Sequence, residues 1–307
     1  MDLLQLAAGV FLAVRINLRY LCLMAVFVSL LRPVHALMRL TRFWNLVIIA
    51  TTQYFTAFFL IETFTIRDGR LFLLVGSTLM IAAAGYIIND YYDIKIDLIN
   101  KPQRVVIGRG ITRRYAIFFH SALSLAGIAI GFLLGWAVGV VNLASVFFLW
   151  AYSNNLKRQP FTGNFLVALL TGAAIGIVNL LYPPVRPSVI IFWLFAVVIT
   201  LVREIIKDME DMKGDQTFGC KTLPIIWGIR KTKRLLYILL ALFAVLALWV
   251  NRFYVGLPLY YFLLFLYVPL IFLLARLVRA DTISDFARLS SFCKVIMLLG
   301  ILSMAWI

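Results

Sequence analysis

The chain has 307 residues, of which 64% are apolar and only 14% are charged, and its mean hydropathy is +0.99. Soluble domains carry about 25% charged residues, so this composition excludes a soluble globular protein and a disordered chain and indicates a polytopic membrane protein. The net charge of +16 does not call for nucleic acid, because basic residues of membrane proteins collect in cytoplasmic loops and on anionic lipid.

Apolar runs long enough to cross a bilayer follow one another along the chain. A bilayer core takes about 20 apolar residues of helix, and runs of this kind predict nine spans. Residues 1–41 are apolar but interrupted by arginines and a proline, and they predict an amphipathic lead-in at the membrane interface, with or without one further embedded helix. We expect a single all-α domain at residues 42–307. The predicted spans are 43–62, 71–88, 115–135, 137–152, 164–181, 188–206, 234–250, 257–276 and 290–307.

The distribution of basic residues tests this topology independently. With the N-terminus in the cytoplasm, 25 of the 29 basic residues fall on the cytoplasmic side, as the positive-inside rule requires. A wrong number of spans would scramble the alternation. The pattern therefore favours nine spans and a cytoplasmic N-terminus. The four basic residues on the other side are Arg67, Arg70, Arg186 and Arg252.

Two groups of aspartates stand where predicted spans end, and both have the spacing i, i+3, i+7. This spacing places all three carboxylates of a group on one helix face. The second group repeats the first after 118 residues, and the four spans between them put both groups on the same side of the membrane. The groups are Asp90, Asp93 and Asp97, and Asp208, Asp211 and Asp215.

Carboxylates on one helix face repel each other unless a cation lies among them. Ionisable groups at membrane depth usually line a cavity or pathway, and a few carboxylates together with phosphate oxygens are typical ligands of Mg²⁺. The matched aspartates therefore predict a Mg²⁺ site. The alternative is a solvated acidic segment that forms salt bridges with the many nearby lysines and arginines.

Basic side chains near the aspartates predict a phosphate-binding site. Arg104, Lys157 and Arg158 are the best candidates for contacts with a diphosphate, since arginine offers a fork of donors and lysine a point charge. The chemistry indicated is departure of a diphosphate whose charge is shared by a metal and by cations. The rest of the substrate would lie in the apolar helix bundle.

These motifs resemble those of the UbiA-type intramembrane prenyltransferase superfamily over nearly the whole chain. Residues 89–97 match the motif Asn-Asp-x-x-Asp-x-x-x-Asp in full, and Asn100, Pro102 and Arg104 match the tail that follows it. Residues 208–215 match a second aspartate motif, and residues 152–158 resemble the Tyr-to-Lys-Arg stretch after the fourth helix.

The resemblance implies nine transmembrane helices bundled around a central cavity, with a polar cap on the cytoplasmic side of the cell (inner) membrane. Both aspartate motifs would bind Mg²⁺ and a polyprenyl diphosphate. The allylic C–O bond would ionise, and an acceptor would capture the carbocation. The expected partners are the polyprenyl diphosphate, a lipid-soluble or amphipathic acceptor and membrane lipids, without nucleic acid.

The resemblance also implies roles for single residues. The six aspartates would bind the metal and the diphosphate, and Asn89 would orient the first site. Glu204, one turn before the second group, would act as an outer ligand or as a base. Contacts with the diphosphate are expected from Arg104, Tyr152, Lys157 and Arg158, contacts with the acceptor from Arg42 and Asn45, and further substrate contacts from Asn164 and Lys221.

The second motif, residues 203–215, looks most like the branch that transfers a geranylgeranyl group to geranylgeranylglycerol phosphate. An aromatic or quinone-precursor acceptor, such as 4-hydroxybenzoate or dihydroxynaphthoate, is the alternative within the family. A cation transporter is the alternative outside it, because matched acidic groups also occur in transporters with internal repeats. Transporters place such groups near the middle of the membrane, whereas these aspartates stand at the ends of the predicted spans.

Overall fold

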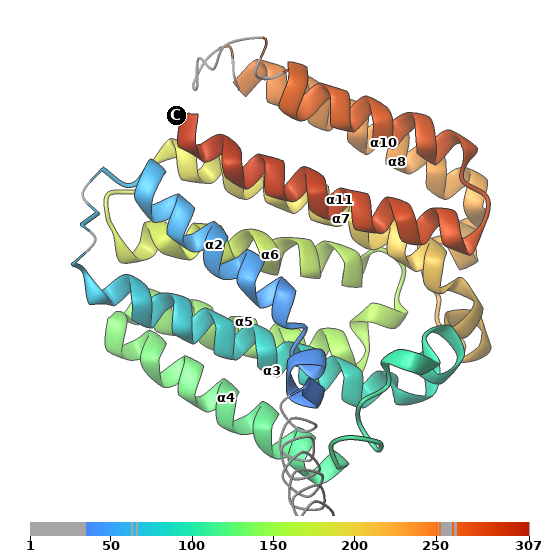
Figure 1. The fold of residues 1–307 in the computed structure, drawn as a ribbon, viewed down its shortest axis with the longest axis horizontal. Helices are drawn as coiled ribbons and strands as arrows, with labels where there is room; N and C mark the ends of the chain where they lie inside the picture. Colours follow the sequence, from blue (N-terminus) through green and yellow to red (C-terminus); the bar gives the residue numbers. More distant parts are fainter. Residues whose placement is uncertain are drawn as a thin grey trace, which may run out of the picture.

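The structure is a computed structural model, and it describes residues 35–62, 64–65, 67–250, 252, 260 and 263–306. The expected all-α architecture is confirmed (Figure 1). The elements are α2 (Phe43–Leu60), α3 (Gly69–Asn100), η1 (Pro102–Arg104), α4 (Arg113–Leu134), α5 (Trp136–Asn154), η2 (Leu156–Arg158), α6 (Thr162–Leu181), α7 (Pro187–Thr217), α8 (Leu223–Val250), η4 (Leu263–Tyr267), α10 (Val268–Arg279), α11 (Ile283–Ser303) and η5 (Met304–Trp306).

Within the described ranges, eight helices are long and apolar enough to cross a membrane. They are α2 to α8 and α11, and each contains most or all of one predicted span. The predicted span 257–276 falls partly outside the described residues. Within the described part, η4 and α10 make residues 263–279 helical. The count of nine spans therefore stays a prediction. Most of the predicted lead-in, residues 1–34, also lies outside the described residues, whereas residues 35–40 are helical.

α3 and α7 are longer than the predicted spans 71–88 and 188–206, because each continues through its aspartate group to Asn100 and Thr217. Apolar side chains mark where a helix can lie in lipid, but the backbone hydrogen bonds of the helix continue beyond that depth. α3 ends at the residue before Lys101-Pro102, since a proline disfavours helical backbone in the residue before it. Both aspartate groups consequently lie in the last turns of the two longest helices.

The helices run side by side in the bundle, and α3 packs against α4 and α5 while α7 packs against α6 and α11. α8 and α10 cover the side of α7 and α11 away from α3 (Figure 1). The loops that follow α3, α5, α7 and α10 all lie toward the right in Figure 1. Both aspartate groups therefore reach the same end of the bundle.

Buried apolar side chains fix the positions of α3 and α7. Ile205 and Ile206 of α7 are fully buried in one core cluster, which includes residues of α8, α10 and α11. Leu71 and Leu74 of α3 belong to a second cluster, shared with α2, α6 and the start of α7. Two rigidly packed helices thus carry the aspartates.

Candidate functional site

Asn100 joins the last turn of α3 to the last turns of α7. Its Nδ2 donates to the carbonyl oxygen of Asp211 at 3.0 Å, and its Oδ1 accepts from the backbone N–H of Gly214 at 2.8 Å. A Cβ atom at position 214 would lie 2.6 Å from the Asn100 side chain. Glycine at this position therefore permits the close approach of the two helices.

The two aspartate groups face each other across this junction. The carboxylate of Asp97 lies close enough to that of Asp211 for the two to repel each other, and the same holds for Asp215 and Asp93. Each pair takes one carboxylate from α3 and one from α7. Both sets of negative charges therefore act on one shared space, which is the arrangement that a cationic ligand requires.

Cations from other elements hold the first aspartate group. The Lys157 Nζ atom, in η2, lies 2.6 Å from Asp93 Oδ1 and donates to Asn89 Oδ1 at 3.3 Å. Burial lowers the pKa of the Lys157 ammonium below its usual value, and the Asp93 carboxylate counteracts this shift. Arg42, which precedes α2, donates to Asp90 Oδ1 at 2.8 Å, and its guanidinium lies 4.9 Å from the centre of the Tyr86 ring.

The second aspartate group has its own partners. Asn164 Nδ2, near the start of α6, donates to Asp208 Oδ2 at 2.8 Å. The Lys101 Nζ atom lies 2.7 Å from Asp211 Oδ1 and 2.9 Å from Glu210 Oε1. Lys101 follows α3 directly, so its side chain connects the end of the first aspartate helix with the second.

The remaining predicted residues lie nearby in different settings. The side chains of Arg158 and Lys221 are exposed, and the Lys221 N–H donates to the Arg158 carbonyl oxygen at 2.7 Å. This bond joins the loop after α5 to the loop after α7. Arg104 belongs to η1, and its side chain lies outside what the structure describes.

The donor set suits a hard divalent cation, since the facing carboxylates offer oxygen ligands of the kind that Mg²⁺ prefers. Among the residues that the structure describes, no three carboxylate, cysteine or histidine side chains form a cluster that could hold a metal ion. Asp93 and Asp211 are instead paired with lysines. The carboxylates have the chemistry of a metal site, and two of those that would bind the metal form ion pairs with lysines.

A cavity begins beside this cluster and is lined by α2, α3, α5, α6, α7 and α11. Most of its wall is apolar, and its charged lining residues gather at the end nearest the aspartates. The charged and amide side chains of this end are Arg42, Asn45, Asn89, Arg203, Glu204, Lys207 and Lys294, and the Tyr152 ring lies beside them.

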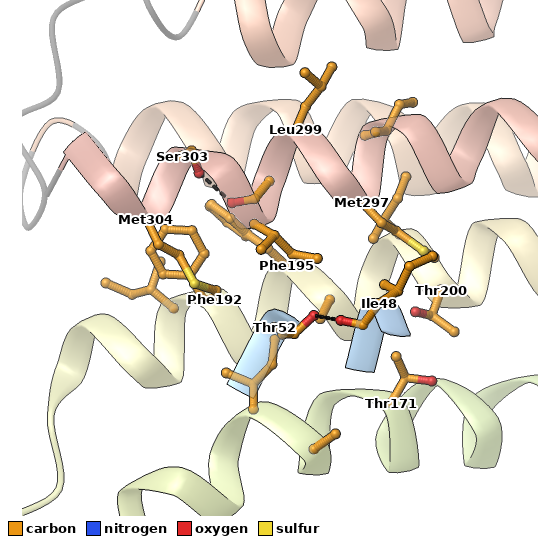
Figure 2. Close-up of a pocket in the computed structure, with 18 of the residues that line it drawn as sticks. Ile48, Thr52, Thr171, Phe192, Phe195, Thr200, Met297, Leu299, Ser303 and Met304 are labelled. Carbon is orange, nitrogen blue, oxygen red and sulfur yellow. Dashed lines mark hydrogen bonds between the residues drawn. The ribbon is translucent and has the colours of Figure 1, made fainter. Parts of the chain in front are cut away.

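A second cavity adjoins the first, because Ile48, Thr171, Ala174 and other residues line both. Figure 2 shows its wall of aliphatic and aromatic side chains, including Phe195 and Met304. Three of its four hydroxyl groups, those of Thr52, Thr171 and Ser303, donate to carbonyl oxygens of their own helices. Thr52 donates to the Ile48 carbonyl oxygen at 2.7 Å, so these hydroxyls leave the wall apolar.

A charged end joined to a long apolar space is suited to an amphipathic substrate that has an anionic head and a hydrocarbon tail. Residues 46–296, more than half of the chain, match the model of the UbiA prenyltransferase family. The chain belongs to the UbiA prenyltransferase family. It is a prenyltransferase embedded in a membrane, and the resemblance of its two aspartate motifs to this family is confirmed.

Three relatives of this prenyltransferase illustrate the similarity. The digeranylgeranylglyceryl phosphate synthase of Saccharolobus solfataricus is 35% identical over 75% of this chain and 81% of its own. A solved structure from work on digeranylgeranylglyceryl phosphate synthase in membranes is 25% identical, with a TM-score of 0.70 over 89% of this chain and 97% of its own. A UbiA homologue from Archaeoglobus fulgidus, solved with GPP and Mg²⁺, is 15% identical, with a TM-score of 0.60 over 89% of this chain and 100% of its own, and shares the fold.

The interpretation of the sequence did not assign Lys101, Tyr86 or Lys294 to the site. Lys294 had a signal that could have revealed it, because a lysine inside an apolar helix usually faces a cavity. Lys101 stands within the tail of the first motif, between Asn100 and Pro102. The contact of Tyr86 with Arg42 depends on how α2 packs against α3, which no local pattern reveals.

Proposed function

We propose that this prenyltransferase transfers a geranylgeranyl group from geranylgeranyl diphosphate to a hydroxyl of a prenylated glycerol phosphate. The observation that carries the proposal is the cavity with a cationic end next to the facing aspartates, in a chain whose named relatives are digeranylgeranylglyceryl phosphate synthases. In this reaction the allylic C–O bond of the diphosphate breaks, an ether C–O bond forms, and the acceptor hydroxyl loses its proton.

The aspartates of α3 and α7 are proposed to hold the diphosphate through Mg²⁺. When bound, the metal would supply positive charge to the departing diphosphate. The Archaeoglobus fulgidus homologue solved with GPP and Mg²⁺ supports this assignment. The residues assigned to the metal are Asp90, Asp93, Asp97, Asp208, Asp211 and Asp215.

Lysine and arginine side chains next to the aspartates are proposed to share the charge of the diphosphate. Lys157 already lies within ion-pair distance of Asp93, so a bound diphosphate would find a donor in place. Arg158 follows Lys157 directly in η2, Arg104 ends η1, and Lys221 lies in the loop between α7 and α8. Asn89 and Asn164 orient Lys157 and Asp208 through the hydrogen bonds that they make.

The apolar cavities are proposed to take the hydrocarbon chains. Tyr152, Arg42 and Asn45 line the first cavity, and we assign them to the reacting carbon and the acceptor. Glu204 also lines this end and is 6% exposed. We assign to Glu204 the acceptance of the hydroxyl proton, with Arg203 and Lys207 holding the carboxylate in place.

We further propose that residues 42–307 form one catalytic domain in the cell membrane, with the aspartate end in the cytoplasm. The excess of basic residues in the loops at that end supports this orientation. The shared core clusters of α2 to α11 support a single domain.

The test is Mg²⁺-dependent release of diphosphate from geranylgeranyl diphosphate by the purified full chain in detergent. Geranylgeranylglyceryl phosphate, 4-hydroxybenzoate and dihydroxynaphthoate are offered as separate acceptors. Ether formation with the first acceptor alone would support the proposal. Turnover with an aromatic acceptor instead would overturn the proposed acceptor, and no turnover with any of them would overturn the proposed transfer.

A further inference from the structure

Residues 35–42, the strap, lie directly before α2, and apart from Arg42 they have no part in the proposed function. The strap is helical over residues 35–40 and turns at Thr41 and Arg42 into α2 (Figure 1). Arg42 has a φ of 52°, in the left-handed region that residues other than glycine rarely adopt. Such a conformation persists only where the surroundings hold it, and Arg42 is held by its ion pair with Asp90 at 2.8 Å. The strap therefore ends on the first aspartate group.

Leu40 anchors the strap in the bundle. Its side chain is fully buried, in a small core cluster that is separate from the two that fix α3 and α7. This cluster joins the strap to α3, to the segment between η1 and α4, and to the start of α4. Its other buried members are Ile87, Val106, Ile107 and Ala116. Leu40 therefore holds segments that are distant in the sequence against one another.

The strap contacts residues 101–112, the loop between α3 and α4, at two further points. The Arg39 guanidinium donates to the carbonyl oxygen of Gln103 in η1. A Cβ atom at Gly110 would lie 3.2 Å from the Cβ atom of Ala36, so the strap approaches the far part of the loop closely. The strap thus holds this loop at both of its ends.

The same loop carries charged residues of the candidate site. The Nζ atom of Lys101, its first residue, lies 2.7 Å from Asp211 Oδ1. Arg104, which is assigned to the diphosphate, follows three residues later. Close-packed side chains transmit displacements from one element to the next. The strap therefore affects the charged groups proposed to bind the metal and the diphosphate, although neither Arg39 nor Leu40 lines the cavity.

We propose that Leu40 and Arg39 are positioning residues, which hold the loop so that Lys101 keeps its contact with Asp211 and Arg104 stays near the diphosphate. This inference rests on the proposed function and adds the segment that keeps the diphosphate side of the site formed. The two residues act through the loop and not by contact with a substrate. Loss of either should weaken binding of the diphosphate substrate and spare binding of the acceptor.

The first test compares the wild-type full chain with Leu40→Ala and Leu40→Met. Leu40→Ala is expected to raise the KM for geranylgeranyl diphosphate at least about tenfold, because it leaves a gap where the loop is packed. The KM for geranylgeranylglyceryl phosphate should stay within about twofold, since Arg42 keeps its own contacts with Asp90 and the Tyr86 ring. Leu40→Met nearly conserves the side-chain volume and should recover most of the loss.

The second test measures amide hydrogen exchange in the same variants. The loop is folded on itself, since the Gly110 N–H donates to the Val106 carbonyl oxygen and the Gly108 N–H to that of Ile111, both at 2.8 Å. Leu40→Ala should speed exchange at these two amides about tenfold or more, while the amides of α6 exchange as in the wild type. Faster exchange in both regions would indicate a general loss of stability and would overturn the inference.

Leu240→Ala is the matched control, because Leu240 of α8 is also buried and lies outside both cavities. It removes the same atoms and should change neither KM. If Leu40→Ala does not fold, Arg39→Met replaces it, since Arg39 is exposed. This variant removes the hydrogen bond to Gln103, and the same difference between the two substrates is expected, with a rise of about threefold or more.

The outcomes separate this inference from the proposed function. Wild-type turnover together with an unchanged KM for the diphosphate in Leu40→Ala would overturn the inference and leave the proposed function standing. A rise of equal size in the KM for both substrates would do the same. Absence of wild-type turnover would overturn the proposed function and the inference with it.

Discussion

Asn100 and Gly214 contact each other where the two aspartate-bearing helices meet. The Gly214 N–H donates to Asn100 Oδ1 at 2.8 Å, and the Asn100 Nδ2 atom donates to the carbonyl oxygen of Asp211 at 3.0 Å. One amide side chain thus satisfies two backbone groups of α7, and it does so next to an aspartate of the site. The separation of the two aspartate groups depends on this contact.

Gly214→Ala is therefore expected to lower activity without unfolding the protein. A Cβ atom at this position would lie 2.6 Å from the Asn100 amide, so the amide must move and both hydrogen bonds are strained. A shift of about 1 Å at a reacting centre can cost about 100-fold in rate. We expect kcat to fall roughly 10- to 100-fold, measured by prenyl transfer from geranylgeranyl diphosphate.

Gly76→Ala is the control for this variant, because Gly76 lies in the same helix as Asn100 and an added Cβ would meet nothing within 4 Å. Alanine in a helix interior stabilises the fold by about 0.5–1 kcal/mol relative to glycine. Activity of Gly76→Ala should match that of the wild type. Equal activity in Gly214→Ala would show that the contact does not position the aspartates.

Removing a carboxylate from the first aspartate group is expected to have the same effect on activity as removing one from the second. Asp93→Asn and Asp211→Asn remove one negative ligand from α3 and from α7, so each should raise the Mg²⁺ concentration needed for half-maximal rate and lower kcat at least about 100-fold. Addition of EDTA to the wild-type protein should abolish diphosphate release, and excess Mg²⁺ should restore it.

Glu62→Gln is the matched change for these two variants. Glu62 is an exposed residue of the loop between α2 and α3, and this loop lies away from the aspartate end. Its substitution also removes one carboxylate, and activity should stay unchanged. If the two aspartate variants retained wild-type Mg²⁺ dependence, the metal would have to be bound elsewhere.

The spacing of the aspartates allowed a correct prediction of their geometry, because a helix returns to the same face after three, four and seven residues. Asp90, Asp93 and Asp97 needed no tertiary information to be placed together. The facing of the two groups was also predictable, since the 118-residue repeat and an even number of spans put both on one side. The apolar runs likewise located eight of the helices. They did not predict the final turns of α3 and α7, because those turns contain charged residues.

Contacts between helices could not be read from the sequence in the same way. The pairing of Arg42 with Asp90 and of Lys101 with Asp211 depends on how α2 and the end of α3 meet their neighbours. Many basic residues stand near the aspartates in the sequence, and the positive-inside rule explains most of them equally well. Only the packed bundle distinguishes Lys101, which reaches the site, from exposed flanking residues such as Arg113.

Lys157 is expected to contribute mainly to binding of the diphosphate substrate. Its Nζ atom lies 2.6 Å from Asp93 Oδ1 and 3.3 Å from Asn89 Oδ1, so it is held in place before the substrate arrives. Lys157→Met should raise the KM for geranylgeranyl diphosphate about 10- to 100-fold, as loss of a charge-assisted hydrogen bond predicts. Lys157→Arg should retain part of this affinity, and Lys231→Met, which changes an exposed lysine of α8, provides the control. An unchanged KM for the diphosphate in Lys157→Met would place the diphosphate away from Asp93.

Ala174 lies where the two cavities adjoin, and it is expected to control the length of the prenyl chain. Its side chain lines both cavities, and its carbonyl oxygen accepts from Gln53 Nε2 at 2.9 Å, a backbone contact that any side chain keeps. Ala174→Phe would fill the passage, so kcat/KM for geranylgeranyl diphosphate should fall at least about tenfold relative to that for geranyl diphosphate. Val245→Phe adds a ring at an exposed position of α8 and should leave this ratio unchanged. If Ala174→Phe also left the ratio unchanged, the prenyl chain would have to follow a path that does not pass from one cavity into the other.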